Sequence, residues 1–317
     1  MKIAAIQMVS GPDLAVNLAR ARHWLEQAAA QGAKLAALPE YFCLMGQADG
    51  DKLALAEAPG DADAPIQQML SRAAAELGLY LIGGTLPLQT STSERPQGDD
   101  LRRPPFGLQA EWPLPATKPL SGLCARAQPP EGVKKGRDGP SLSCERVRNA
   151  CCVYGPDGAQ VARYDKMHLF RFDNGSERYD EGRVLEAGTA PVAAQLDSLR
   201  VALSVCYDLR FPELYRALGP CDLISVPAAF TFVTGQAHWE LLLRARAVEN
   251  QAYVIAPAQG GLHQNGRRTW GHTMIVDPWG EVLGCLPEGE GLVLADLDAK
   301  RLAAIRHQLP ALQHRRL

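Results

Sequence analysis

The sequence predicts a layered α/β sandwich with internal pseudo-symmetry, because a strand–helix–strand unit occurs twice in the chain. One unit spans residues 2–40 and the other spans residues 201–227, and a proline ends the second strand of each. The composition is that of a globular protein, with 46% hydrophobic and 21% charged residues. The 317 residues suffice for one large α/β domain or two small ones.

The first unit opens with a strand over Lys2–Val9. A helix is expected over Asp13–Gln31, with Asp13 as its N-cap and Gly32 at its end. Its apolar residues recur at helical spacing, at Leu14, Leu18, Ala21, Leu25 and Ala28. The second strand, Lys34–Glu40, stops at a proline and a carboxylate.

The middle of the chain contains further predicted elements and one segment without hydrophobic periodicity. We expect a helix over Pro65–Leu77 and strands over Tyr80–Gly83, Ala150–Tyr154 and Ala159–Tyr164, the last two flanking a Gly-Pro-Asp-Gly turn. Nine of the 23 prolines fall between Pro96 and Pro140. We therefore interpret residues 90–146 as a Pro/Gly/Arg-rich surface insertion, largely irregular or disordered. Its basic residues could contact a partner, but a solvated loop is the simpler interpretation.

The second unit consists of a strand (Val201–Val205), a helix (Pro212–Leu218) and a strand (Asp222–Pro227). Proline suits the first turn of a helix because its ring presets φ and its missing N–H is not needed there. The elements expected after this unit are a helix over 236–250, a strand over 252–258, a hairpin around Asp277-Pro-Trp-Gly280, a strand over 291–296 and a helix over 299–308.

The charge and cysteine patterns exclude several classes of protein. The formal net charge is −2, so no overall field attracts nucleic acid or an anionic membrane. No apolar run approaches the ~20 residues that cross a bilayer, and the N-terminus shows no signal peptide. Eight cysteines occur without any CxxC pair, so no zinc or thioredoxin motif is predicted. We expect a reduced, cytoplasmic protein without a metal.

Three chemically useful side chains follow predicted strands, namely Glu40, Lys166 and Cys206. A cysteine nucleophile needs a base to take its proton and a positive group to hold the oxyanion that forms. A carboxylate, an ammonium and a thiol from three strand ends make such a set. Each residue alone also has a simpler interpretation, as a solvated charge or a buried structural cysteine.

Three sequence blocks resemble the signature blocks of the carbon–nitrogen hydrolase (nitrilase) superfamily, in the order of that family. They are Leu38-Pro-Glu-Tyr-Phe42, Tyr164-Asp-Lys-Met-His-Leu-Phe170 and Ser204-Val-Cys-Tyr-Asp-Leu-Arg-Phe-Pro-Glu213. The resemblance covers essentially the whole chain apart from the insertion. It implies a four-layer α-β-β-α sandwich in a single domain, residues 1–317, and a hydrolase that acts on carbon–nitrogen bonds.

The resemblance also implies roles for individual residues. Cys206 would be the nucleophile, Glu40 the general base and Lys166 the oxyanion stabiliser, with the backbone N–H of Tyr207 as a second donor. A second family glutamate corresponds best to Glu181, with Glu177 as the competitor. Lys166 is expected to favour the thiolate form of Cys206, and the chemistry requires neither a metal nor a cofactor.

Within the superfamily, the chain most resembles the deaminated glutathione amidase branch. The blocks that carry this likeness include Thr234-Gly-Gln-Ala-His-Trp-Glu240, Val276-Asp-Pro-Trp-Gly280 and Leu309-Pro-Ala-Leu-Gln-His-Arg-Arg316. Such enzymes cleave the amide between a 2-oxoglutaryl group and Cys-Gly. An anionic 2-oxo acid calls for a cation, and Arg210 is the candidate carboxylate clamp, with Arg171 and Thr234 as weaker candidates. A salt bridge from Arg210 to Glu213 or Glu240 is the structural alternative.

Other functions remain open at this point. An ω-amidase that acts on 2-oxoglutaramate would use the same three residues and release ammonia. A true nitrilase or a carbamoyl-amide hydrolase fits the branch-like blocks less well. A non-catalytic scaffold of the same fold is the alternative of another class. Members of the family usually pair, so the resemblance implies a homodimer.

Overall fold

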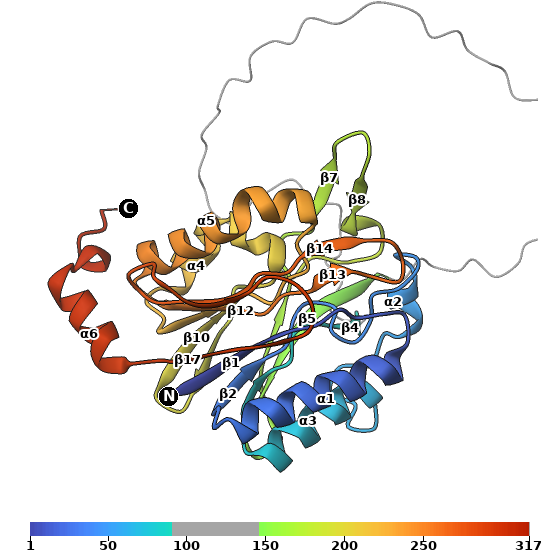
Figure 1. Ribbon diagram of the computed structural model, residues 1–317, viewed down its shortest axis with the longest axis horizontal. Coiled ribbons are helices and arrows are strands. Elements are labelled where there is room, and N and C mark those ends of the chain that lie inside the picture. The colour runs from blue at the N-terminus through green and yellow to red at the C-terminus, as the bar shows by residue number, and fades with distance from the viewer. Residues whose placement is uncertain (91–145, 317) are drawn as a thin grey trace, which may run out of the picture. The chain divides into compact units, whose positions relative to one another are not determined.

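Two β-sheets carry the fold of this protein, and the computed structural model describes them over residues 1–90 and 146–316 (Figure 1). The first sheet has the strand order β17-β1-β2-β3-β5-β4, with β6 paired to β5. Its strands β1, β2 and β3 are parallel to one another, and β17 runs antiparallel to β1. The bounds are β1 Lys2–Gln7, β2 Leu35–Ala37, β3 Tyr80–Ile82, β4 Leu86–Gln89, β5 Val147–Tyr154, β6 Gln160–Asp165 and β17 Gly291–Asp296.

The second sheet has the strand order β16-β15-β12-β11-β10-β9. Its three central strands, β10, β11 and β12, are again parallel, so each sheet contains a β-α-β-α-β core. The repetition confirms the predicted layered arrangement with two similar halves. The bounds are β9 Ala193–Leu196, β10 Leu199–Leu203, β11 Leu223–Ser225, β12 Tyr253–Ala256, β15 Thr273–Val276 and β16 Val282–Leu286.

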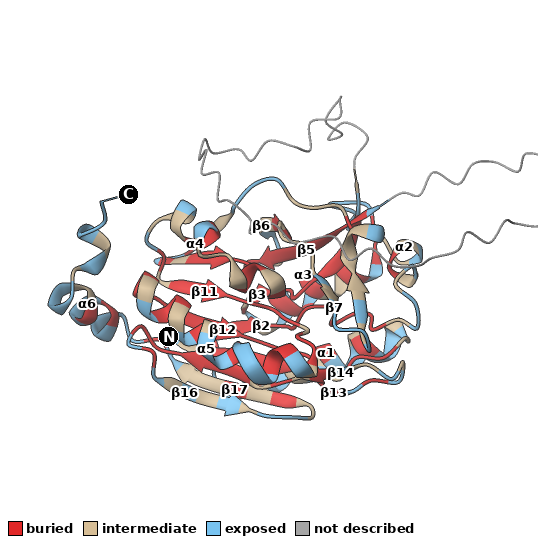
Figure 2. Cartoon of the chain, turned by 90° about the horizontal axis from the view of Figure 1, so that it is seen from above, coloured by how far each residue is buried: buried red, intermediate tan, exposed pale blue. Residues whose placement is uncertain are grey.

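Helices cover the outer face of each sheet, and the two inner faces pack together. Figure 1 shows α1 (Leu14–Ala30) and α3 (Pro65–Leu77) on one side, with α4 (Pro212–Leu218) and α5 (Phe232–Asn250) on the other. In β1, Ile3 and Ala5 belong to the core between the sheets, whereas Ala4 and Ile6 pack with α1 and α3. This alternation follows from the two-residue period of a strand. The central strands of both sheets are buried, whereas the strands β16 and β17 at the sheet edges include half-buried and exposed residues (Figure 2), and the layers form the predicted α-β-β-α sandwich.

The predicted bounds of α3, α4 and β17 coincide with those of the structure. Helix α5 begins at Phe232 instead of residue 236, because the Thr231 side chain caps its first turn and accepts a hydrogen bond from the Thr234 N–H. The elements without a sequence-based prediction are short: α2 Asp51–Ala54, β4, β9, and the hairpins β7 Arg171–Asp173 with β8 Arg178–Asp180 and β13 Gly260–Leu262 with β14 Arg268–Trp270. The remaining helical elements are η2 Glu181–Arg183, η3 Cys206–Arg210, α6 Ala299–Gln308 and η4 Ala311–Gln313.

The predicted insertion, residues 90–146, lies outside the described residues except at its two ends. These ends meet, because β4 and β5 are antiparallel neighbours and the Thr90 hydroxyl donates to the Arg146 carbonyl at 3.3 Å. The segment therefore connects two strands of one hairpin. Over the described ranges, no helix has both the length and the apolar character to cross a membrane.

Candidate active site

Glu40 stands just beyond β2 and is held by three donors from other parts of the fold. Its Oε1 accepts from the Lys166 ammonium and the Asn149 amide, each at 2.9 Å, and its Oε2 accepts from the Ala229 N–H at 2.9 Å. The side chain is only 1% exposed. A buried carboxylate needs such partners, since burying an unpaired charge is very costly. Glu40 is therefore fixed in one orientation.

A sharp turn follows β2 and places Glu40 just beyond the end of the strand. Tyr41 takes a left-handed backbone conformation with φ of +57°, and its N–H donates to the Thr85 hydroxyl at 3.0 Å. Gly84 lies beneath this turn with φ of +59°, where an added Cβ would come within 2.2 Å of the Pro39 carbonyl oxygen. Only glycine fits this close approach. The strand–proline–carboxylate pattern thus ends in a turn that needs a glycine from a neighbouring segment.

Lys166 follows β6 directly and is fully enclosed between two carboxylates. Its Nζ donates to Glu40 Oε1 at 2.9 Å and to Glu181 Oε2 at 2.8 Å. The Lys166 side chain has no exposed surface. The two carboxylates compensate the loss of hydration that a buried ammonium suffers.

Glu181, and not Glu177, joins this cluster. Glu181 begins η2 and accepts from three groups, including the Tyr41 hydroxyl at 2.7 Å and the Phe170 N–H at 2.7 Å. Glu177 lies in the turn between β7 and β8, where its N–H donates to Asn174. The geometry therefore favours the first of the two glutamates considered from sequence.

Cys206 opens η3 in a left-handed backbone conformation, with φ of +51°. No element was predicted between the strand that ends at Val205 and the helix that begins at Pro212, and the short helix η3 lies there. The Cys206 N–H donates to the Pro227 carbonyl at 2.9 Å. The Tyr207 N–H donates to no protein atom among the described residues. Left-handed geometry at a non-glycine residue costs about 1–3 kcal/mol and is found mostly at functional sites.

A buried carboxylate, Asp208, ties the lysine segment to the cysteine segment. It accepts from the Tyr164 hydroxyl at 2.8 Å, the Val205 N–H at 2.9 Å and the His168 N–H at 3.0 Å. His168 Nδ1 lies 2.7 Å from the same side chain, and the His168 ring stacks on Phe211. Asp208 therefore fixes both strand ends relative to each other.

The enclosed setting decides which groups carry protons. Burial raises the pKa of Glu40 above its usual value, although Lys166 opposes this. Burial also raises the pKa of Cys206 well above its ordinary value, and Glu40 adds to the effect. Lys166 does favour the thiolate form of Cys206, as expected, but burial and the Glu40 charge outweigh its attraction, so the net shift of the Cys206 pKa is upward.

The ammonium keeps its proton despite its burial. Burial disfavours the charged form of Lys166, but Glu181 and Glu40 outweigh it and raise its pKa well above the usual value. Burial likewise acts against the charged form of Glu181, yet the attraction of Lys166 lowers the Glu181 pKa. The Lys166–Glu181 pair is therefore ionised, and Glu40 is the carboxyl group whose proton affinity is increased.

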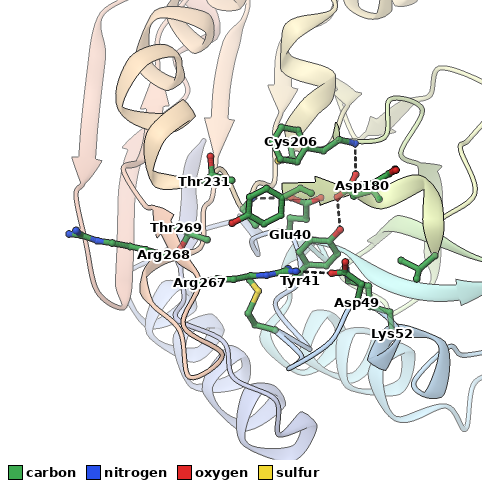
Figure 3. Close-up of a pocket in the computed structure, with 16 residues that line it drawn as sticks. Glu40, Tyr41, Asp49, Lys52, Asp180, Cys206, Thr231, Arg267, Arg268 and Thr269 are labelled. Carbon is green, nitrogen blue, oxygen red and sulfur yellow. Dashed lines mark hydrogen bonds and ion pairs between the residues drawn. The ribbon is translucent and has the colours of Figure 1, made fainter. Parts of the chain in front are cut away.

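Cys206 lines two cavities, and most of the other predicted site residues line one or the other of them. The larger cavity encloses about 630 Å³ and is lined by Glu40, Glu181 and Cys206 among others (Figure 3). The smaller one, about 210 Å³, is lined by Cys206 together with Tyr207, Arg210 and Thr234. Of the predicted substrate-binding residues, the structure does not bring Arg171 to either cavity, because it is exposed on β7.

Arg210 makes neither of the salt bridges considered from sequence. Within the described residues its guanidinium has no carboxylate partner, and Glu240 pairs with Arg244 instead. Arg210 Nη1 lies 3.2 Å from His238 Nδ1, and its Cζ lies 5.4 Å from the centre of the Phe230 ring. Its positive charge is therefore available to a ligand in the smaller cavity.

Sequence reasoning missed several residues of the larger cavity. Tyr41 lies in the block Leu38-Pro-Glu-Tyr-Phe42, and its position next to Glu40 is the one feature of the sequence that could have indicated a place in the site. Lys52, Asp49 and Arg267 come from short or irregular segments that show no periodicity. Across the described ranges, no three metal-binding side chains come together as a metal site would require.

The fold, the enclosed Glu–Lys–Glu cluster and the adjacent cysteine define a hydrolase of amide-type carbon–nitrogen bonds. The family model described as carbon-nitrogen hydrolase matches residues 2–101 and 105–307. The chain therefore belongs to the carbon–nitrogen hydrolase family.

Individual relatives show which members of the family this chain resembles. It is 35% identical to the deaminated glutathione amidase of Synechocystis, over 98% of this chain and 97% of that protein. It is 33% identical to the human omega-amidase NIT2, over 99% of this chain and 95% of that protein. Among solved structures, the NitFhit protein of C. elegans superposes with a TM-score of 0.74 at 31% identity. That match covers 99% of this chain but 65% of the longer C. elegans chain.

Proposed function

We propose that this protein hydrolyses the amide of deaminated glutathione to 2-oxoglutarate and cysteinylglycine through a thioester on Cys206. The observation that carries the proposal is the cavity that brings Cys206 together with Glu40. The Glu40 carboxylate in turn accepts a hydrogen bond from the Lys166 ammonium. The relatives named deaminated glutathione amidase support this choice of substrate.

The first half of the reaction forms the thioester. The Cys206 sulfur attacks the amide carbonyl carbon while its proton passes to Glu40. The Lys166 ammonium and the Tyr207 N–H stabilise the oxyanion of the tetrahedral intermediate. The carbon–nitrogen bond then breaks, and Glu40 returns its proton to the departing amine.

The second half releases the acid. Glu40 takes a proton from a water molecule as the water oxygen attacks the thioester carbonyl. The carbon–sulfur bond breaks, the 2-oxo acid leaves, and the sulfur regains the proton from Glu40. Glu181 keeps Lys166 charged and oriented throughout, because it accepts two of the contacts of that ammonium, at 3.0 and 2.8 Å.

The smaller cavity suits the anionic acyl group. Arg210 lines this cavity without a carboxylate partner in the described part of the chain, so it is the proposed clamp for the 2-oxo acid. Thr234 has a more structural position, since its hydroxyl lies 2.8 Å from that of the capping residue Thr231. Arg171 is not part of this proposal.

The decisive experiment measures release of 2-oxoglutarate from deaminated glutathione and from 2-oxoglutaramate, with the wild type beside Cys206→Ala. We expect a preference for deaminated glutathione that the variant loses while its circular dichroism is unchanged. Preference for 2-oxoglutaramate would instead assign the ω-amidase reaction, which the similarity to the human omega-amidase favours as the second candidate. Hydrolysis that survives in Cys206→Ala would refute the thioester mechanism, and no hydrolysis by the wild type would favour a scaffold.

We also propose that the protein is a cytoplasmic homodimer. The six cysteines in the described residues are free, which suits a reducing compartment. On α5, the large apolar side chains of Leu241 and Val248 are exposed, and the exposed Trp279 precedes Gly280, which packs on Val248. Such apolar exposure is typical of an interface.

The proposed domain organisation is one hydrolase domain with a surface insertion over residues 90–146. It is supported by the hydrogen bond and strand pairing that close the two ends of that segment. Replacement of residues 91–145 by a short glycine–serine linker should leave a cooperatively folding protein, and a loss of the thermal transition would contradict this organisation.

A further inference from the structure

The two cavities on either side of Cys206 each contain a different cation. Arg210 lines the smaller cavity, whereas Lys52 and Arg267 line the larger one. A substrate whose amide carbon reaches Cys206 therefore extends one half into each cavity. The larger cavity is also lined by carboxylates, Asp49, Asp180 and Glu181 among them, so an anionic group can bind there only beside a cation that they leave unpaired.

Lys52 is the unusual member of this set. It lies in the short helix α2 and is only 8% exposed, and its Nζ lies 4.3 Å from the centre of the Tyr41 ring. Within residues 1–90 and 146–316 its ammonium makes no salt bridge and donates no hydrogen bond to a protein atom. Burial lowers the pKa of Lys52, while Glu181 and Asp49 attract its ammonium at longer range, so a ligand carboxylate in contact with Nζ would stabilise the charged form.

The other cations of the larger cavity are already paired. Arg267 pairs with Asp49 at 2.7 Å, and Figure 3 shows this contact beside Tyr41. Arg268 points away from the other labelled residues in Figure 3 and pairs with Glu288 at 3.3 Å. Lys166 is enclosed by its two carboxylates. Lys52 thus holds the unpaired positive charge in this part of the described structure.

The position of Glu40 assigns the two halves of the substrate. Glu40, the proposed proton donor to the departing nitrogen, lines the larger cavity and does not line the smaller one. The leaving amine must contact that donor, so the leaving half occupies the larger cavity.

We propose that Lys52 binds the carboxylate at the end of the leaving group and thereby selects amides whose amine half is anionic. This inference rests on the proposed function and deepens it. It also separates the two candidate substrates, because the ammonia released from 2-oxoglutaramate carries no carboxylate. Tyr41 is a positioning residue here, because the Lys52 ammonium lies 4.3 Å from the centre of its ring.

The test compares Lys52→Met with the wild type on three substrates. These are deaminated glutathione, its analogue with a C-terminal carboxamide, and 2-oxoglutaramate. Lys52→Arg keeps the charge, and Lys300→Met removes an exposed lysine from α6 as the matched control. Thermal denaturation of every variant checks that the fold is intact.

We expect Lys52→Met to lower kcat/KM for deaminated glutathione by about tenfold or more, through KM, because a charge-assisted hydrogen bond is lost. Its kcat/KM for 2-oxoglutaramate should stay within about threefold of the wild-type value. The carboxamide analogue should already be poorer for the wild type and lose little more in Lys52→Met. Lys52→Arg should retain most of the preference, and Lys300→Met all of it.

Equal losses on all three substrates would overturn the proposal, because Lys52 would then act on the fold or on the acyl half. An unchanged kcat/KM for deaminated glutathione in Lys52→Met would overturn it as well, while leaving the proposed function intact. If the wild type hydrolysed neither deaminated glutathione nor 2-oxoglutaramate, the proposed function would fail first, and this inference with it.

Discussion

At the scale of single residues, the proposed mechanism makes Cys206 and Glu40 a pair that shares a proton during the reaction. Burial and the nearby carboxylate raise the pKa of Cys206 well above its usual value, which favours the neutral thiol. The carboxylate of Glu40 has an increased proton affinity, because burial raises its pKa from 4.5. A thiol that ionises only as its proton passes to Glu40 is protected from oxidation between turnovers.

This pairing predicts the acidic side of the pH profile. The reaction needs Glu40 ionised, so kcat/KM should fall as the pH drops through the raised pKa of Glu40. The inflection is therefore expected above 4.5, the ordinary value for a glutamate. Initial rates measured from acidic to neutral pH, under conditions where the fold is intact by circular dichroism, would check this. An inflection at or below the ordinary glutamate value would argue against Glu40 as the base.

Asp208 offers a second prediction at this scale. The carboxylate of Asp208 makes four contacts as an acceptor, whereas the amide of Asp208→Asn has one accepting oxygen and one donating NH₂ group. The substitution therefore breaks part of the link between the Lys166 and Cys206 segments. We expect a loss of about 2–4 kcal/mol in the free energy of unfolding. A fall of about 100-fold in kcat should accompany it, since small displacements of reacting groups are costly.

Chemical denaturation and steady-state kinetics measure these two effects. Glu213→Gln, on the exposed side of α4, is the matched control and should change neither. If Asp208→Asn kept wild-type kcat, the carboxylate would have a structural role alone.

At the scale of elements, the first turn of α5 shapes the wall shared by both cavities. Thr231 caps this helix and lines each cavity, and Gly235 follows one turn later. An added Cβ at Gly235 would come within 2.2 Å of the Trp270 side chain. Because Gly235 has no side chain, β14 can approach α5 closely. Thr269, which lies on β14, then reaches the larger cavity.

Gly235→Ala should therefore destabilise the protein by about 1–3 kcal/mol, the usual cost of overpacking, and raise KM. Gly50→Ala is the matched control, because no atom lies within 4 Å of its added Cβ. Thermal denaturation and kinetics on the same preparations would measure both changes. Equal stability of the two variants would show that Trp270 moves aside without cost.

Sequence patterns predicted the long elements of this fold but not the short ones. Helix α3 and strand β17 carry a full period of buried positions, so their bounds could be predicted. The hairpin β7–β8 and helix α2 have three or four residues each, too few for a period to emerge, and contacts with distant segments hold them.

The residues of the candidate site also fall into those that the sequence predicts and those that it does not. Glu40, Lys166 and Cys206 follow strands with strong signals, and the structure brings them together. Lys52 and Arg267 reach the cavity from a short helix and a hairpin turn, so nothing in the local sequence marks them. The attraction of Lys166 for the thiolate could be predicted from the motif, but the larger effect of burial on the Cys206 pKa could not, because burial depends on all the surrounding segments.

At the scale of the whole molecule, the exposed face of α5 is the proposed contact between two copies. Leu241 is 67% exposed and Val248 is 49% exposed, seven residues apart on one side of the helix. Leu241→Glu combined with Val248→Glu should convert a dimer to a monomer, because like charges would face each other across a two-fold interface.

Sedimentation velocity on the wild type and the double variant measures this directly. Val161→Glu, at a strand residue that is 48% exposed, is the control and should leave the dimer intact. A wild type that sediments as a monomer, or a double variant that remains a dimer, would refute an interface at this helix.

The pairing of β1 with β17 has a consequence for the synthesis of the chain. The Met1 amino group donates to the Leu297 carbonyl, 296 positions away in sequence, and β1 depends on β17 to cover one edge. While a ribosome makes this protein, the nascent chain therefore presents the bare edge of an apolar strand until β17 has emerged. The first sheet closes only after β17 has been made, so earlier folding on the ribosome is limited to incomplete intermediates that chaperones would need to shield.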